Sequence, residues 1–229
     1  MQNLFKFDKL NFITAGMPLR TGKGSYTSAF GVLDDMELDG MELEFVHGVR
    51  MSDENRKFVK DKSKNFVITA HGPFYINLNS KEEEKIDASV QRIIDTASVA
   101  SQAGAFSITY HAAFYMGADK ETVFNRVKTQ TKRIIDVLER ENINVWIRPE
   151  TTGKATQWGD EDEIIRLSKE FEQVLPCIDF SHLQVLIIRM TNFPMFWKKL
   201  GMNWDNMLLK TSMVILQALN ILLKVKDSI

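Results

Sequence analysis

Short runs rich in β-branched and aromatic residues alternate along this chain with longer segments of helical period, and this alternation limits the fold more than any other feature. Strands are predicted at residues 10–15, 40–46, 65–70, 105–110, 143–148 and 175–180, and the clearest helices at residues 82–104, 120–142 and 160–173. Because helices separate the strands, the strands are expected to run parallel in one sheet. The chain is therefore of the α/β class, as an open doubly wound sheet or most of a (β/α)8 barrel.

The loop after the first strand favours the barrel. Residues 16–24 read GMPLRTGKG, which lacks the GxGxxG order of a dinucleotide-binding sheet. We therefore expect an incomplete (β/α)8 TIM barrel of about six β/α units over residues 1–183, followed by an atypical tail over residues 184–229.

Composition limits the location and the partners. A net charge of −1 predicts no binding of membranes or nucleic acids through bulk electrostatics, so a polyanion would need a local patch or metal ions. The single cysteine, Cys177, fits a reducing compartment and is expected in the core. The first residues lack the apolar run of a signal peptide, and the apolar residues 213–225 are too few to span a bilayer. A cytoplasmic location without membrane contact is expected.

Ligand-type side chains stand where four consecutive predicted strands end. They are His71, His111, Glu150, Asp179 and His182. The carboxyl ends of parallel strands meet at one edge of the sheet, so these side chains are expected to lie together. Imidazole and carboxylate groups suit zinc or manganese, and Glu150 could bridge two cations. A single histidine at a strand end usually has a structural role, and this is our interpretation of His47. Ligand-type residues at the ends of four consecutive strands instead predict a metal site.

Basic residues near the same edge are candidates for phosphate binding. Arg20 and Lys23 belong to the loop after the first strand, and Lys154 follows Glu150 closely. A solvated loop without a ligand remains the alternative for each of them.

Four segments together carry a resemblance to a known family. ITAHGPFYINL, SITYHAAFYMG, IRPETTGK and CIDFSHL occur in this order within residues 8–183, and they resemble the endonuclease IV-type apurinic/apyrimidinic endonucleases and their xylose-isomerase-like barrel relatives. The resemblance implies a (β/α)8 barrel holding two or three zinc ions, with manganese as an alternative. It also implies cleavage of DNA 5′ to abasic sites in base excision repair, and no protein partner.

The resemblance assigns roles to the predicted ligands. His71 and His111 would hold a first metal, and Glu150 would bridge it to a second and serve as the catalytic carboxylate. Asp179 would bind the second metal and His182 the third. Two alternatives stay open, which are a xylose-isomerase-like sugar isomerase or epimerase and a non-catalytic metal-binding barrel.

The tail departs from the family pattern. No histidine follows His182 and no glutamate follows Glu172, so the second and third metals would lack ligands. Residues 184–229 contain only two of the 30 acidic residues, Asp205 and Asp227. We interpret this change as a shift of reading frame near codon 184, which the gene sequence in all three frames would test. The chain is then expected to be inactive and poorly soluble because of unpaired strand edges, or a monomer if it folds.

Overall fold

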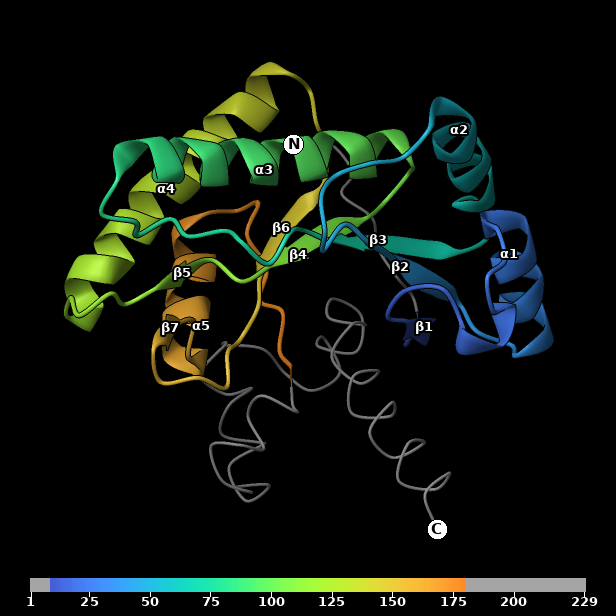
Figure 1. Cartoon of the computed structure of the whole chain (residues 1–229), viewed down its shortest axis with the longest axis horizontal. Coiled ribbons are helices and arrows are strands. Elements are labelled where there is room, and N and C mark those ends of the chain that lie inside the picture. Colours follow the sequence, from blue (N-terminus) through green and yellow to red (C-terminus); the bar gives the residue numbers. More distant parts are fainter. Residues whose placement is uncertain (1–8, 180–229) are drawn as a thin grey trace, which may run out of the picture.

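The computed structural model describes residues 9–179, and its centre is a parallel sheet whose strands follow one another in chain order (Figure 1). The strands are β1 (Ile13–Thr14), β2 (Gly40–Glu44), β3 (Val67–His71), β4 (Ser107–Tyr110) and β6 (Trp146–Pro149). A doubly wound sheet would reverse its strand order at one point, whereas a (β/α)8 barrel does not. The predicted α/β barrel architecture is therefore confirmed.

The sixth predicted strand pairs with β6 but does not form a continuous ladder. Only the isolated parallel bridges Ile147–Val174 and Glu150–Cys177 connect it to β6. The amides of Leu175 and Cys177 donate to the carbonyls of Ile147 and Pro149. Pro149 has no amide to donate in return, and this missing bond interrupts the pairing.

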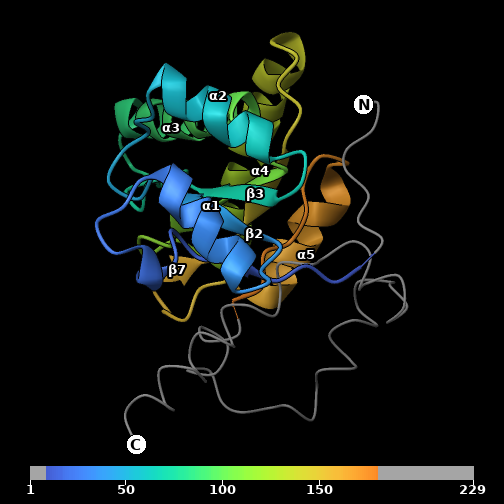
Figure 2. The ribbon, with the colours of Figure 1, turned by 90° about the vertical axis from the view of Figure 1, so that its right-hand side faces the viewer.

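Five helices lie along one side of the sheet and contact each other in chain order from α1 to α4 (Figures 1 and 2). They are α1 (Tyr26–Asp35), α2 (Asp53–Lys62), α3 (Glu83–Gln102), α4 (Lys120–Arg140) and α5 (Glu161–Glu170), with a short 3₁₀ helix η1 (Leu19–Thr21) before α1. The three helices predicted individually correspond to α3, α4 and α5. Asp119 and Asp160 cap α4 and α5 by accepting a hydrogen bond from the third amide of each helix.

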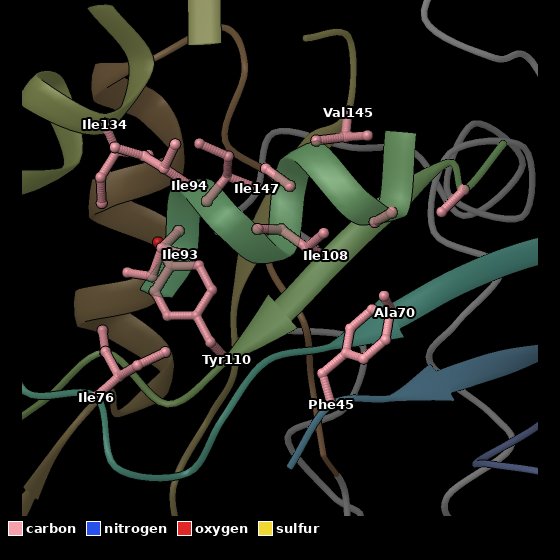
Figure 3. Close-up of a cluster of buried hydrophobic side chains, with 14 of the residues drawn as sticks. Phe45, Ala70, Ile76, Ile93, Ile94, Ile108, Tyr110, Ile134, Val145 and Ile147 are labelled. Atoms are coloured by element: carbon pink, nitrogen blue, oxygen red, sulfur yellow. The ribbon is translucent and has the colours of Figure 1, made fainter. Parts of the chain in front are cut away.

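The apolar core lies between the sheet and the helices (Figure 3). Ile93 and Ile94 of α3 and Ile134 of α4 pack with Ile108 and Tyr110 of β4. Side chains alternate between the two faces of a strand. The face turned away from the helices therefore carries the intervening residues, and in β2, β3 and β6 several of these are polar.

A second, antiparallel sheet joins two loops at the carboxyl edge. It consists of β5 (Ala113–Phe114) and β7 (Gln157–Trp158), which follow β4 and β6. The hydroxyl of Tyr115 donates to the carboxylate of Glu163 in α5 and so anchors this sheet to the helix. Within residues 9–179, no helix has both the length and the apolar character that a membrane span requires. His182 and the predicted tail at 184–229 lie outside the described residues.

Candidate metal centre

Three of the predicted ligands converge at the carboxyl edge of the sheet. His71 is the last residue of β3, His111 directly follows β4, and Glu150 directly follows β6. One potential ligand atom from each lies within 4.8 Å of the other two. Oε2 of Glu150 is 3.2 Å from Nε2 of His71 and 3.5 Å from Nε2 of His111.

These distances fit the donor set around a small divalent cation. A tetrahedral ion with bonds of about 2.0–2.1 Å to nitrogen and oxygen separates its ligand atoms by roughly 3.3 Å. The distances from Glu150 Oε2 to the two imidazoles bracket this value. The two separations from Glu150 therefore match those around such an ion, and the ligand atoms of the two imidazoles lie within 4.8 Å of each other.

The ring of His71 is oriented by the main chain. Its Nδ1 lies 2.7 Å from the carbonyl oxygen of Gly72, and a carbonyl can only accept, so Nδ1 carries a proton and donates it. This leaves Nε2 directed at Glu150 as the atom that could bind a cation. A hydrogen bond from the second ring nitrogen is the usual way in which proteins set the tautomer of a metal-binding histidine.

Two carboxylates, those of Glu150 and Glu42, act on His71 when no cation is present. Burial by itself lowers the pKa of His71, but the hydrogen bond with Glu150 and the charge of Glu42 outweigh it and raise the pKa to about 9. At neutral pH the metal-free site therefore holds a proton on His71. A divalent cation would compete with this proton for the same carboxylates.

Glu42 of β2 is a polar residue of this region that our sequence analysis missed. It is buried, with 7% of its surface exposed, and its strand register places it beside Thr69, whose hydroxyl lies 3.4 Å from Oε2. Burial raises the pKa of Glu42 to about 7, the charge of His71 partly offsets this effect, and Glu150 adds to it. The alternation in GMELE, with a glutamate at every second position of an otherwise apolar strand, could have indicated it.

Asp179 ends the sixth strand segment and lies outside the group of three. It is buried, and its amide donates to Oγ1 of Thr151 on the neighbouring chain segment at 2.8 Å. Its role as a ligand stays a prediction, and so does that of His182, which is outside the described residues. Cys177 is buried, as expected, and burial raises the pKa of its thiol.

The three basic candidates are exposed on loops that follow strand ends. Arg20 lies in η1 and Lys23 just after it, both between β1 and α1, while Lys154 lies between β6 and β7. Their contact with a substrate stays a prediction. The ring of His47 meets the ring of Phe74 edge to face, with centroids 5.4 Å apart.

Comparisons with known proteins agree with this architecture. Residues 30–211 match the model of the xylose isomerase-like TIM barrel family. An uncharacterised protein of Methanocaldococcus jannaschii is 45% identical over 174 residues, which cover 76% of this chain and 62% of that protein. The chain thus spans less than two thirds of the length of this curated relative.

Two crystal structures are similar to this one at low sequence identity. A D-tagatose 3-epimerase-like protein has a TM-score of 0.64 at 16% identity, with 94% of this chain and 86% of that chain covered. Endonuclease IV from Thermus thermophilus has a TM-score of 0.64 at 15% identity, with 90% and 74% covered. At such identities the likeness concerns the fold alone. The family match over residues 30–211 shows that the chain belongs to the xylose isomerase-like TIM barrel family.

Proposed function

We propose that this protein is a metal-dependent phosphodiesterase that cleaves DNA 5′ to abasic sites, with zinc as the cation and manganese as the alternative. The observation that carries the proposal is the convergence of His71, His111 and Glu150 within 4.8 Å at the carboxyl edge of the sheet. Two imidazoles with one carboxylate form a donor set that suits these cations.

The residues of the chain would hold and orient the reacting groups. Bound divalent cations would polarise the phosphate and activate a water molecule for attack on phosphorus. Glu150 offers its carboxylate to both imidazoles, and His71 is kept in one orientation by the carbonyl of Gly72. Asp179, which follows the segment paired with β6, would bring a second carboxylate to a neighbouring cation.

Exposed aromatic rings in the loop that follows β3 support a nucleic-acid substrate. Phe74 and Tyr75 are 54% and 46% exposed, although they follow His71 by only three and four residues. Their rings meet edge to face, and the guanidinium of Arg92 lies 4.7 Å from the centre of the Tyr75 ring. Exposed rings of this kind stack on bases, and the exposed Arg20 and Lys23 would contact the phosphates on either side of the cleaved bond.

The test is cleavage of a duplex oligonucleotide that contains one abasic-site analogue, with added zinc or manganese and the full chain. We expect incision 5′ to the abasic site, and none in the intact duplex, when the reading frame near codon 184 is restored; the chain as given should bind metal without incision, because no histidine follows His182 and no glutamate follows Glu172. Glu150→Gln and His71→Ala should lose both incision and stoichiometric metal binding. Glu139→Gln, which neutralises an exposed carboxylate on α4, is the matched control and should behave as the unmodified chain.

A sugar isomerase or epimerase is the second candidate, and the similarity to the D-tagatose 3-epimerase-like structure favours it. Metal-dependent interconversion of ketohexoses without DNA cleavage would support this candidate and refute the nuclease. Stoichiometric metal binding with neither reaction would support a non-catalytic metal-binding barrel.

A further inference from the structure

Three residue pairs, each joined by buried hydrogen bonds between a side chain and the main chain, connect β6 and the residues that flank it to the sixth strand segment at a constant spacing. In each of them the two partners are 28 residues apart. Nε2 of Gln173 donates to the carbonyl of Val145 at 3.0 Å, Nε and Nη2 of Arg148 donate to the carbonyl of Pro176 at 3.2 and 3.0 Å, and the amide of Asp179 donates to Oγ1 of Thr151 at 2.8 Å. We call these three contacts the strand lock.

The strand lock strengthens a pairing that the backbone leaves weak. Pro149 interrupts the ladder, and Pro176 has no amide of its own to donate. The carbonyl of Pro176 is thus the one main-chain hydrogen-bonding group of that residue, and Arg148 binds it with two donors. Arg148 is only 1% exposed, so this contact forms where water does not compete with it.

The position of the strand lock relates it to the metal centre. Glu150 stands between Arg148 and Thr151, the two residues of β6 and its extension that hold the next segment. Asp179 is itself one of the partners, through its amide. The strand lock therefore determines where the backbone of Asp179 lies relative to that of Glu150.

We propose that Arg148 and Thr151 are positioning residues that hold Glu150 and Asp179 at the separation required to bind neighbouring cations. This inference rests on the proposed function, in which both carboxylates are ligands. Neither positioning residue needs to touch the cation or the substrate. Each acts through the placement of the sixth strand segment.

Positioning by Arg148 favours cation binding, whereas the positive charge of Arg148 would oppose it. A buried guanidinium near Glu150 repels a divalent cation, so removal of the charge alone should strengthen binding. Loss of the two hydrogen bonds to Pro176 should weaken cation binding. The carboxylate of Asp179 would then be displaced and would have to move back before it could coordinate the cation. The sign of the change in affinity therefore separates positioning from simple electrostatics.

The experiment is a titration of the full chain with Co²⁺. Calorimetry measures the affinity, and the visible absorption of the bound ion reports on its coordination. Arg148→Met removes both the charge and the hydrogen bonds, and Arg148→Lys keeps the charge but cannot donate through two fixed nitrogens. Thr151→Val removes the hydroxyl at constant shape, and Thr151→Ser retains it. Arg133→Met, which removes an exposed guanidinium paired with Asp87 on α3, is the matched control.

We expect the affinity for Co²⁺ to fall roughly 10- to 100-fold in Arg148→Met, Arg148→Lys and Thr151→Val, with an altered absorption spectrum. Thr151→Ser and Arg133→Met should bind as the unmodified chain does. Unchanged or stronger binding in both Arg148→Met and Thr151→Val would overturn the inference and leave the proposed function intact. An unmodified chain that binds no Co²⁺ would overturn the proposed function and the positioning role together. Should Arg148→Met not fold, the comparison of Thr151→Val with Thr151→Ser decides the outcome.

Discussion

The proton on His71 makes a quantitative prediction about the pH dependence of metal binding. A cation can bind Nε2 only after this atom has lost its proton. With a pKa of about 9, roughly 1% of His71 is neutral at pH 7. The apparent affinity for a divalent cation should therefore rise about tenfold per pH unit between about pH 7 and 9, and level off above that range.

The assay is a titration with Co²⁺ or Mn²⁺ at about pH 6.5, 7.5 and 8.5, with the protons released measured in two buffers of different ionisation enthalpy. Close to one proton should leave His71 per cation bound at the lowest pH. The variant Glu42→Gln provides a control, because the charge of Glu42 helps to raise the pKa of His71. In this variant the apparent affinity for the cation should stop rising at a lower pH than in the unmodified chain.

An affinity that changes less than about threefold over this range would refute the reasoning, since competition with a bound proton requires a much steeper dependence. His71→Ala then distinguishes the two ways in which it can fail. If this variant binds metal as well as the unmodified chain, His71 is not a ligand. If it binds more weakly, His71 is a ligand that is already neutral in the metal-free protein.

Three further predictions concern stability. His71 and Glu42 both have a raised pKa in the folded chain, from ordinary values of 6.5 and 4.5, so the folded state binds more protons. The free energy of unfolding of the chelator-treated protein should therefore fall as the pH rises. Deprotonation of Glu42 lowers it up to about pH 7, and deprotonation of His71 lowers it up to about pH 9. A thermal midpoint that rises over this range would contradict this prediction. Gly40→Ala should lower the free energy of unfolding, measured with denaturant, by at least about 2 kcal/mol, because the added Cβ would lie 1.8 Å from a carbonyl oxygen of β3. Gly31→Ala, on the open side of α1, is the control and should be neutral or stabilising. Asp160→Ala should cost about 1 kcal/mol through loss of the α5 cap, and Asp160→Asn much less; equal losses in the two variants would refute the capping role.

The periodicity of the sequence was sufficient to predict most of the sheet. β-rich runs and helical segments depend on local spacing, so the strands near residues 40, 65, 105 and 143 and the helices α3, α4 and α5 follow directly from it. The sixth strand was predicted as a continuous element, but Pro149 on its partner interrupts the ladder. The antiparallel pair β5–β7 was not predicted, because two-residue strands leave no periodic pattern.

The candidate site could be predicted only in part. His71, His111 and Glu150 were identified because each stands at the end of a strand, and parallel strands bring their ends together. Glu42 was missed because it lies inside a strand, where its alternation with Met41 and Leu43 was read only as β structure. Its contribution to the pKa of His71 depends on distances across the sheet that no local pattern contains.

The sequence by itself determined the fold class and the identity of the ligand-type residues, because local periodicity and the ends of strands are properties of consecutive residues. Only the tertiary structure decided that three of these residues approach within 4.8 Å, that Glu150 and Glu42 raise the pKa of His71, and that side chains bind main-chain groups 28 residues away and so join β6 to the next segment. These features depend on the register between strands and on burial. Both depend on how strands that are far apart in the sequence pair and on how the helices pack against the sheet, and local periodicity does not contain these contacts.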